Sequence, residues 1–118
     1  MVSNLARDIL KAGLDDWVPL AAIEGFARLR THGSVEDDLR EESLQAIREL
    51  VLDGLAEIGE VSDGGFFECE QPLEEALNQV SETWKDTDLN TWGFSLWVSN
   101  TPRGDQEAKR FEGEATSL

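Results

Sequence analysis

Apolar residues near the start of the chain recur at helical spacing. Leu5, Ile9 and Ala12 stand at positions i, i+4 and i+7, which predicts a short helix over residues 4–12. Gly13 follows directly and is typical of a helix end in the left-handed conformation.

A second helix is expected immediately afterwards. Asp15 or Asp16 can cap it, and Pro19 is tolerated only in its first turn. Its predicted apolar stripe consists of Val18, Ala22, Phe26 and Leu29. A loop over residues 31–34 then precedes the next helix.

The third predicted helix, over residues 35–53, has the clearest amphipathic pattern. Its apolar face consists of Leu39, Leu44, Ile47, Leu50 and Val51. Ser34 is a favourable N-cap with Asp37 three positions later, and Gly54 ends the helix. Arg40 falls on the apolar side, which indicates either a long side chain that reaches solvent or a small error of phase.

The next segment reads as a β-hairpin. Residues 56–62 and 66–70 are rich in strand-forming types, and they flank the turn sequence Asp63-Gly64-Gly65. Gly59 interrupts the alternation of the first strand and suggests a bulge there.

A fourth helix, one more strand and a last helix complete the pattern. Pro72 starts the fourth helix, which ends near Lys85 and has the stripe Leu73, Leu77, Val80 and Trp84. Residues 92–99 alternate with period two and predict a third strand, with Trp92, Phe94, Leu96 and Val98 on one face. A short last helix runs from Thr101 and Pro102 to about Phe111.

These elements predict an α+β fold in which helices pack on a small three-stranded antiparallel sheet. The 118 residues match a single domain over residues 1–118, with an ordered core of about 4–111 and a flexible tail over 112–118.

Charge is the strongest compositional signal, because 25 acidic residues stand against 10 basic ones and give a net charge of −15. From Ser34 to Glu82 the chain has fifteen acidic residues and only Arg40 and Arg48 as bases, or about −13. Such a surface repels phosphate backbones and anionic membranes, so neither a nucleic acid nor a membrane is expected as a partner. An alternative is that the acidity only maintains solubility.

The N-terminal segment and the single cysteine favour a cytoplasmic protein. Charged residues interrupt the first apolar positions, so no secretory signal is expected, and no apolar run reaches the ~20 residues of a membrane span. Cys69 is expected to remain a free thiol.

Two resemblances follow from these motifs. The segment Leu50-Val-Leu-Asp-Gly-Leu-Ala-Glu-Ile-Gly-Glu-Val61, with the Gly-Gly hairpin and Phe66-Phe67 after it, looks like the recognition helix and wing of a winged-helix domain. DNA-binding members carry basic and amide side chains on the exposed side of that helix. Here that side carries acids, which contradicts the DNA-binding role that the resemblance implies.

The remaining part of the chain is similar to small bacterial proteins that end in an Asn-Thr-Pro-x-Gly-Asp segment, which is residues 100–105 here. Some of these resemble immunity proteins of contact-dependent or polymorphic toxin systems. That resemblance implies a basic toxin domain as the partner, with the oligomeric state left open.

The acidic positions define a candidate protein-binding surface. On the third helix Asp38, Glu42, Glu49 and Asp53 form one stripe beside the outward apolar Leu52. Such a stripe is typical of an interface that attracts a basic protein and then packs on it. The wing adds Glu57, Glu60, Glu68 and Glu70. Trp97 is either a second anchor or a side chain packed under the first or last helix.

The sequence offers little for catalysis, a cofactor or a metal site. One histidine, His32, and one cysteine, Cys69, lie far apart with no third group arranged around them. The carboxylate pairs at i, i+4 in the third helix lack the ligand pattern of a calcium loop. We therefore expect no enzyme but an inhibitor, an immunity protein that occludes the nucleic-acid-binding or active-site surface of a nuclease toxin. A winged-helix scaffold or regulatory module within a larger complex is the alternative.

Overall fold

The computed structural model describes residues 3–31 and 35–116. In chain order the elements are α1 (Asn4–Ala12), β1 (Val18–Pro19), α2 (Leu20–Thr31), α3 (Glu36–Leu52), β2 (Ala56–Ser62), β3 (Gly65–Glu68), α4 (Leu73–Asp86), α5 (Leu89–Trp92), β4 (Trp97–Asn100) and α6 (Pro102–Thr116). The predicted α+β class is confirmed. No helix within the described ranges combines the length and apolar character that crossing a membrane requires.

The sheet has four antiparallel strands in the order β1-β4-β2-β3, so the predicted three-stranded sheet is wrong. The additional strand is β1, where Val18 pairs with Val98 and Pro19 with Trp97. The apolar pattern of the sequence instead predicts that both residues belong to the second helix. Proline is acceptable here because β1 is an edge strand, where a missing N–H need not break the ladder.

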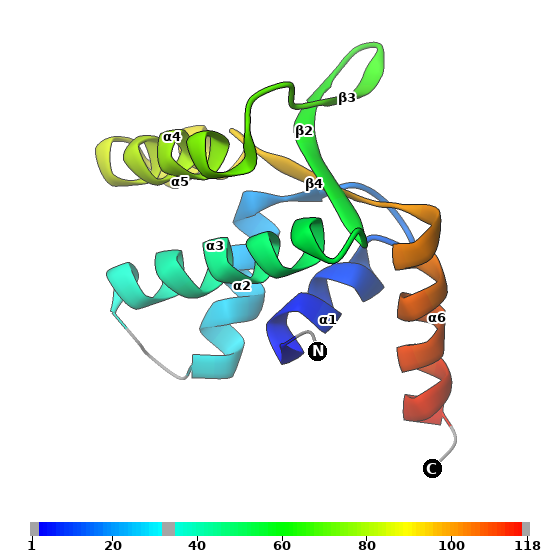
Figure 1. Ribbon diagram of the computed structural model, residues 1–118. Helices are drawn as coiled ribbons and strands as arrows, with labels where there is room; N and C mark the ends of the chain where they lie inside the picture. Colours follow the sequence, from blue (N-terminus) through cyan, green and yellow to red (C-terminus); the bar gives the residue numbers. More distant parts are fainter. Residues whose placement is uncertain (1–2, 32–34, 117–118) are drawn as a thin grey trace.

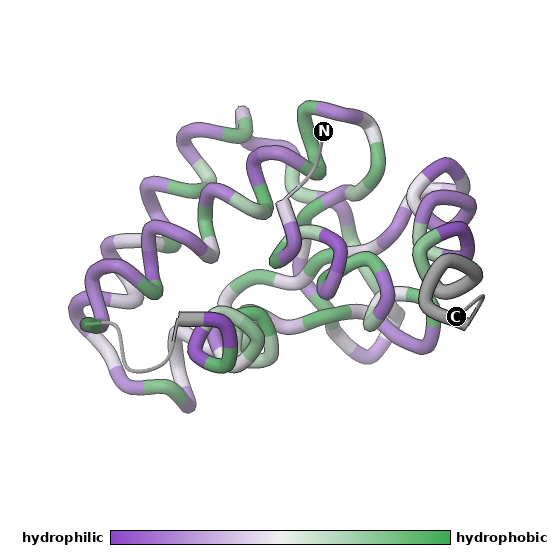
Figure 2. The backbone as a smooth tube through the Cα atoms, turned by 90° about the horizontal axis from the view of Figure 1, so that it is seen from below, coloured by the Kyte–Doolittle hydropathy of each residue, from purple (hydrophilic) through white to green (hydrophobic). Residues whose placement is uncertain are grey.

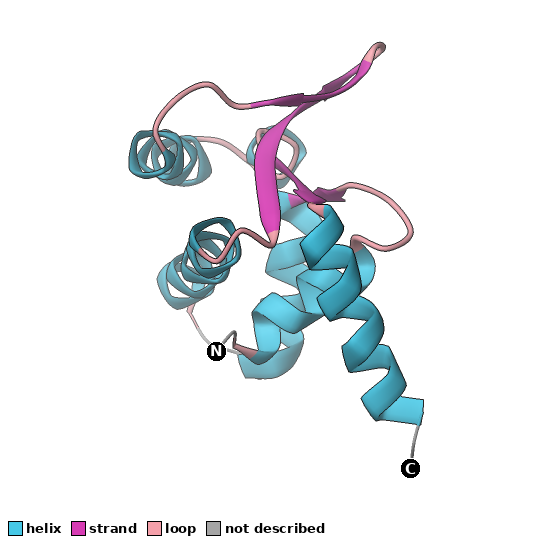
Figure 3. Ribbon diagram, turned by 45° about the vertical axis from the view of Figure 1, so that its right-hand side comes forward, coloured by secondary structure: helices cyan, strands magenta, loops and turns pink. Residues whose placement is uncertain are grey.

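The hairpin of β2 and β3 projects away from the helices (Figure 1). Below it in this view lie α1, α2 and α3, with α4 and α5 on one side and α6 on the other. Figure 3 shows the same projection of the hairpin from another direction. Hydrophobic and hydrophilic stretches alternate along the helices (Figure 2), as expected when each helix buries one face.

Three helices bury the faces that the pattern predicted. The buried side chains on these faces are Leu5 and Ile9 of α1, Leu39, Leu44, Ile47 and Leu50 of α3, and Leu77, Val80 and Trp84 of α4. Arg40 is buried on the inner side of α3, where its Nη1 lies 3.1 Å from Asp37 Oδ1. The N-cap of α3 is Val35, which makes no side-chain cap hydrogen bond, so the predicted cap position at Ser34 is wrong. Ser34 and His32 themselves lie outside the described residues.

The predicted phase of α2 is wrong. The helix begins at Leu20, and its buried apolar residues are Leu20, Ile23 and Ala27. Leu29, assigned to the inner stripe, is 76% exposed. The error arises because Val18 is buried as a strand residue, so counting helical positions from it shifts the stripe.

The predicted strand over residues 92–99 is also partly wrong. Trp92 belongs to the short helix α5, and the strand covers only Trp97–Asn100. Trp92 is buried because its ring stacks on that of Trp84 with centroids 3.9 Å apart. Phe94 is exposed, because the chain between α5 and β4 is irregular and does not keep the period-two alternation.

Gly13 and Gly59 allow close packing and do not have the predicted roles of a left-handed helix end and a β-bulge. Gly13 has φ −68°, not a left-handed value, and a side chain there would collide with the amide of Asn100. Gly59 pairs regularly with Glu68 and Trp97, so the expected bulge is absent from β2. A Cβ at Gly59 would overlap the backbone carbonyl oxygen of Phe67 and lie 2.9 Å from the ring of Phe66.

The Asn-Thr-Pro-x-Gly-Asp segment connects β4 to α6 and fastens both to the rest of the domain. Asn100 Nδ2 donates to Leu10 O at 2.9 Å and to Asp105 Oδ1 at 3.1 Å. Thr101 N donates to Leu55 O at 3.0 Å, and Thr101 Oγ1 donates to Gly54 O at 2.8 Å. The role of this motif visible in the structure is therefore mechanical. The helix it starts continues to Thr116, beyond the predicted end near Phe111.

Candidate protein-binding surface

The predicted stripe on α3 lies on the outward side of the helix. Asp38, Glu42 and Asp53 are exposed, Glu49 is half-buried, and Leu52 is 71% exposed. At 100° per residue Glu41 and Gln45 lie within the same stripe, and both are exposed. The stripe predicted from the sequence does not include these two residues, although the same helical wheel contains them.

Contacts on either side fix the position of this stripe. Toward α1, the backbone N–H of Ser3 donates to Glu49 Oε2 at 2.9 Å. Toward α4, Arg48 Nε donates to Glu74 Oε2 at 2.7 Å. This hydrogen bond lowers the pKa of Glu74 and raises the pKa of Arg48. The stripe therefore lies between α1 and α4.

The hairpin carboxylates lie on both faces of the sheet. Directly opposed residues of antiparallel strands share a face, and Gly59 is paired with Glu68. Glu57 shares that face, since it is two residues from Gly59, whereas Glu60 points to the other side. Glu70 follows the end of β3 and is exposed.

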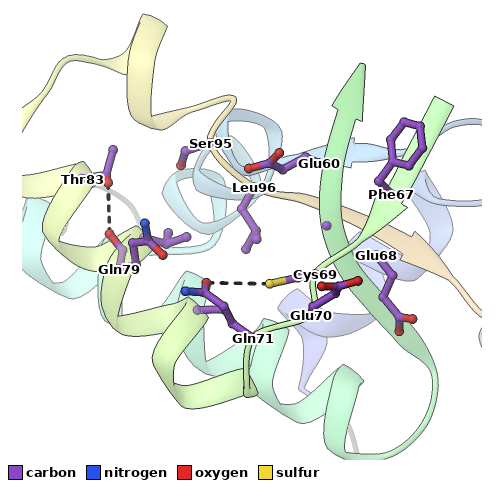
Figure 4. Close-up of a pocket in the computed structure, with 13 residues that line it drawn as sticks. Glu60, Phe67, Glu68, Cys69, Glu70, Gln71, Gln79, Thr83, Ser95 and Leu96 are labelled. Atoms are coloured by element: carbon purple, nitrogen blue, oxygen red, sulfur yellow. Dashed lines mark hydrogen bonds between the residues drawn. The ribbon is translucent and has the colours of Figure 1, made fainter. Parts of the chain in front are cut away.

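Two hollows lie beside the hairpin. A cleft of about 460 Å³ separates it from α4, with Glu60, Phe67 and Glu70 on one side and Gln79 and Thr83 on the other (Figure 4). A second hollow of about 380 Å³ lies where the hairpin base meets the end of α3, and its lining includes Val51, Gly54 and Glu57. Glu68 lines both hollows.

None of the seven ion pairs between described residues uses a carboxylate of this surface. The eight carboxylates concerned are Asp38, Glu42, Glu49, Asp53, Glu57, Glu60, Glu68 and Glu70. The cations pair with other acids, for example Arg30 with Asp8 and Arg110 with Glu107. The negative charge of this surface is therefore not neutralised by ion pairs of the described residues.

Aromatic side chains gather at the sheet. The sequence predicts Trp97 as a candidate anchor, but it does not predict the pairing of Trp97 with Phe94 or of Trp17 with Phe66. Trp97 is half-buried on β4, and its ring centroid lies 6.0 Å from that of Phe94. Trp17 and Phe66 form a second pair at 6.1 Å. Part of Trp97 thus stays accessible beside the exposed Phe94, and Trp17 is exposed beside Phe66.

Among the described residues no group of three or more His, Cys, Asp or Glu side chains is arranged to hold a metal ion. Cys69 is a free thiol that lines the 460 Å³ cleft, with its Sγ 3.9 Å from Gln71 Oε1. His32, the single histidine, lies outside the described residues.

Comparison with known proteins adds no assignment to this surface. No protein-family model, no curated protein and no solved structure matches the chain.

Proposed function

We propose that this protein binds a basic protein partner through α3 and the β2–β3 hairpin. The observation that carries the proposal is the set of eight carboxylates that no base of the described residues neutralises. None of the ten basic residues of the chain lies within residues 55–71. Such a surface attracts cationic proteins and repels phosphate backbones.

The specific form of the proposal is an inhibitor of a basic nuclease domain, as an immunity protein inhibits a toxin. The carboxylates would occupy positions that substrate phosphates otherwise take, so binding and inhibition would be one event. Leu52 supplies an exposed apolar contact within the charged stripe, where packing can hold the partner after electrostatic attraction has oriented it.

A scaffold or regulatory module is the second candidate, and the order of the elements favours it. The sequence α1-β1-α2-α3-β2-β3 follows the order of a winged-helix domain, with α3 as recognition helix and the hairpin as wing. The insertion of β4 between β1 and β2 departs from a three-stranded winged-helix sheet. The neighbouring genes distinguish the candidates, because a toxin gene directly upstream supports inhibition and an operon of metabolic or transcription genes supports a scaffold.

Protection against a neighbouring toxin domain tests the inhibitor proposal. We expect Asp38→Lys, Glu42→Lys and Asp53→Lys together to abolish both protection in cells and capture of the co-expressed toxin. Glu49 is left unchanged because its carboxylate accepts the N–H of Ser3. The matched control changes three exposed acids elsewhere, Asp15, Asp86 and Asp88, to lysine.

Both triple variants change the net charge equally. The comparison therefore separates the effect of where the charges lie from the effect of the total charge. Loss of protection only in the α3 variant supports the proposed surface. Undiminished protection by that variant contradicts it, and equal loss in both variants indicates that only the total charge matters.

A further inference from the structure

The two edges of the sheet differ in how they are protected against pairing with another strand. β1, at one edge, is two residues long and contains Pro19, and both features oppose strand addition. β3, at the other edge, contains neither proline nor lysine, and it pairs with β2 in a regular register without a bulge.

The ladder leaves two residues of β3 with outward-facing backbone groups. Cys69 N donates to Ile58 O at 2.8 Å, which makes these two residues a hydrogen-bonded pair. In antiparallel ladders such pairs alternate with pairs that do not bond to each other, so Phe67 bonds to β2 whereas Phe66 and Glu68 face away. Within the described residues, no other backbone or side-chain hydrogen bond involves the main chain of Phe66 or Glu68.

The charge of the hairpin selects among possible occupants of this edge. Its carboxylates are Glu57, Glu60, Asp63, Glu68 and Glu70, and residues 55–71 contain no base. Two copies paired through β3 would bring ten carboxylates together without compensation, which opposes self-association. A lysine- or arginine-rich strand would be attracted by the same charges.

We propose that an extended basic segment of the partner adds to the sheet as a fifth strand, antiparallel or parallel to β3, bonded to the backbone of Phe66 and Glu68. Alternate side chains of such a strand point to opposite faces. On one face they would pass Glu60 and Phe67 at the 460 Å³ cleft, and on the other face they would pass Glu68. This inference rests on the proposed function for the basic character of the partner and adds the mode of recognition.

A peptide that alternates lysine and valine over nine residues is a direct probe. Binding should slow amide hydrogen exchange at Phe66 and Glu68, as measured by NMR of the intact protein. The same peptide with N-methyl groups on alternate residues keeps its charge but lacks the donors on one edge. We expect N-methylation on the bonding edge to weaken binding about tenfold, because this is the affinity that about one to two backbone hydrogen bonds contribute.

A variant pair at Glu68 tests the same edge from the protein side. Glu68→Pro removes the outward N–H without removing a bond to β2, whereas Glu68→Gln removes only the charge. We expect Glu68→Pro to bind the peptide roughly five- to tenfold more weakly than Glu68→Gln. If Glu68→Pro does not fold, as judged by circular dichroism, the N-methylated peptide still decides.

Three results would overturn the inference. The first is equal binding of the plain and N-methylated peptides, with resonance shifts on α3 and no protection of the amides of Phe66 and Glu68. The acidic surface would then bind basic chains without strand addition, and the proposed function would stand. The second is no binding of the plain peptide at low salt. The third is protection of both amides in the free protein together with a dimer in sedimentation, which would identify a second copy as the occupant.

Discussion

Gly104 offers the sharpest test of the packing between α6 and the connection from α3 to β2. A Cβ at this position would overlap the carbonyl oxygen of Leu55, and it would lie 2.9 Å from the carbonyl carbon and 3.3 Å from Leu10 Cδ2. The atoms in the way are mainly backbone, and that backbone accepts the hydrogen bond from Thr101 N. Relief of the overlap therefore requires the two segments to separate.

Two terms of opposite sign determine the effect of Gly104→Ala. Alanine is favoured over glycine in a helix by about 1 kcal/mol, and Gly104 lies in the first turn of α6. Overpacking of a closely packed site costs about 1–3 kcal/mol, and the weakened bond from Thr101 adds about 1 kcal/mol. We expect the steric term to dominate, with a net loss of about 2 kcal/mol in the free energy of unfolding.

Gly25→Ala is the matched control, because nothing lies within 4 Å of a Cβ at that position in α2. The same substitution should there stabilise the protein by about 0.5–1 kcal/mol. Urea unfolding followed by tryptophan fluorescence and circular dichroism measures both variants. A Gly104→Ala variant as stable as the unsubstituted protein would refute the close approach of α6 to Leu55.

Three further predictions concern other parts of the fold. Ile23→Ala should cost about 2–5 kcal/mol, whereas Leu29→Ala should change stability by less than about 0.5 kcal/mol, and the reverse order in urea unfolding would restore the originally predicted phase of α2. Asn100→Asp should destabilise more than Asn100→Ala in thermal unfolding, because it replaces the donor to Leu10 O with a carboxylate beside Asp105; equal losses would count against that hydrogen bond. The Arg48–Glu74 pair should stabilise the protein slightly above the ordinary carboxyl pKa of 4.5, and this contribution should disappear as the pH falls through the lowered pKa of Glu74. The difference between unsubstituted protein and Glu74→Gln, measured from pH titrations of the unfolding midpoint, should therefore vanish in acid and shrink in high salt.

The local sequence pattern was sufficient to predict the buried face of an element wherever a single periodicity held throughout that element. The stripes of α1, α3 and α4 were predictable because their apolar residues recur at helical spacing and face a single core. β1 was not predictable, because two residues carry no periodicity and their pairing partner Val98 is eighty positions away in the chain. Residues 92–98 misled for a different reason. Their alternation fits a strand, but Trp92 ends α5 and stacks on Trp84, and the chain up to β4 is irregular.

The candidate surface was predictable only in part. The outward side of α3 follows from the helical wheel, so the exposure of Asp38 and Glu42 could be derived from sequence. Which acids form ion pairs could not be derived from the sequence. Arg48 of α3, for example, pairs with Glu74 of α4, and the packing of these two helices cannot be read from a local pattern. The separation of Glu57 from Glu60 onto opposite faces does follow from strand alternation, whereas the two hollows beside them depend on where α4 packs.

The placement of charge in the structure favours binding over solubility as the reason for the acidity. Solubility needs net charge but no particular arrangement, and it is served equally well by acids scattered over every element. Here Asp38 and Glu42 repel each other at i, i+4, and the protruding hairpin carries five carboxylates and no base. The edge strand in this hairpin also lacks the lysine or proline that commonly protects such edges. Under the proposed function, its carboxylates would oppose pairing between identical chains and leave the edge open to a basic strand, so one arrangement of charge would serve both purposes.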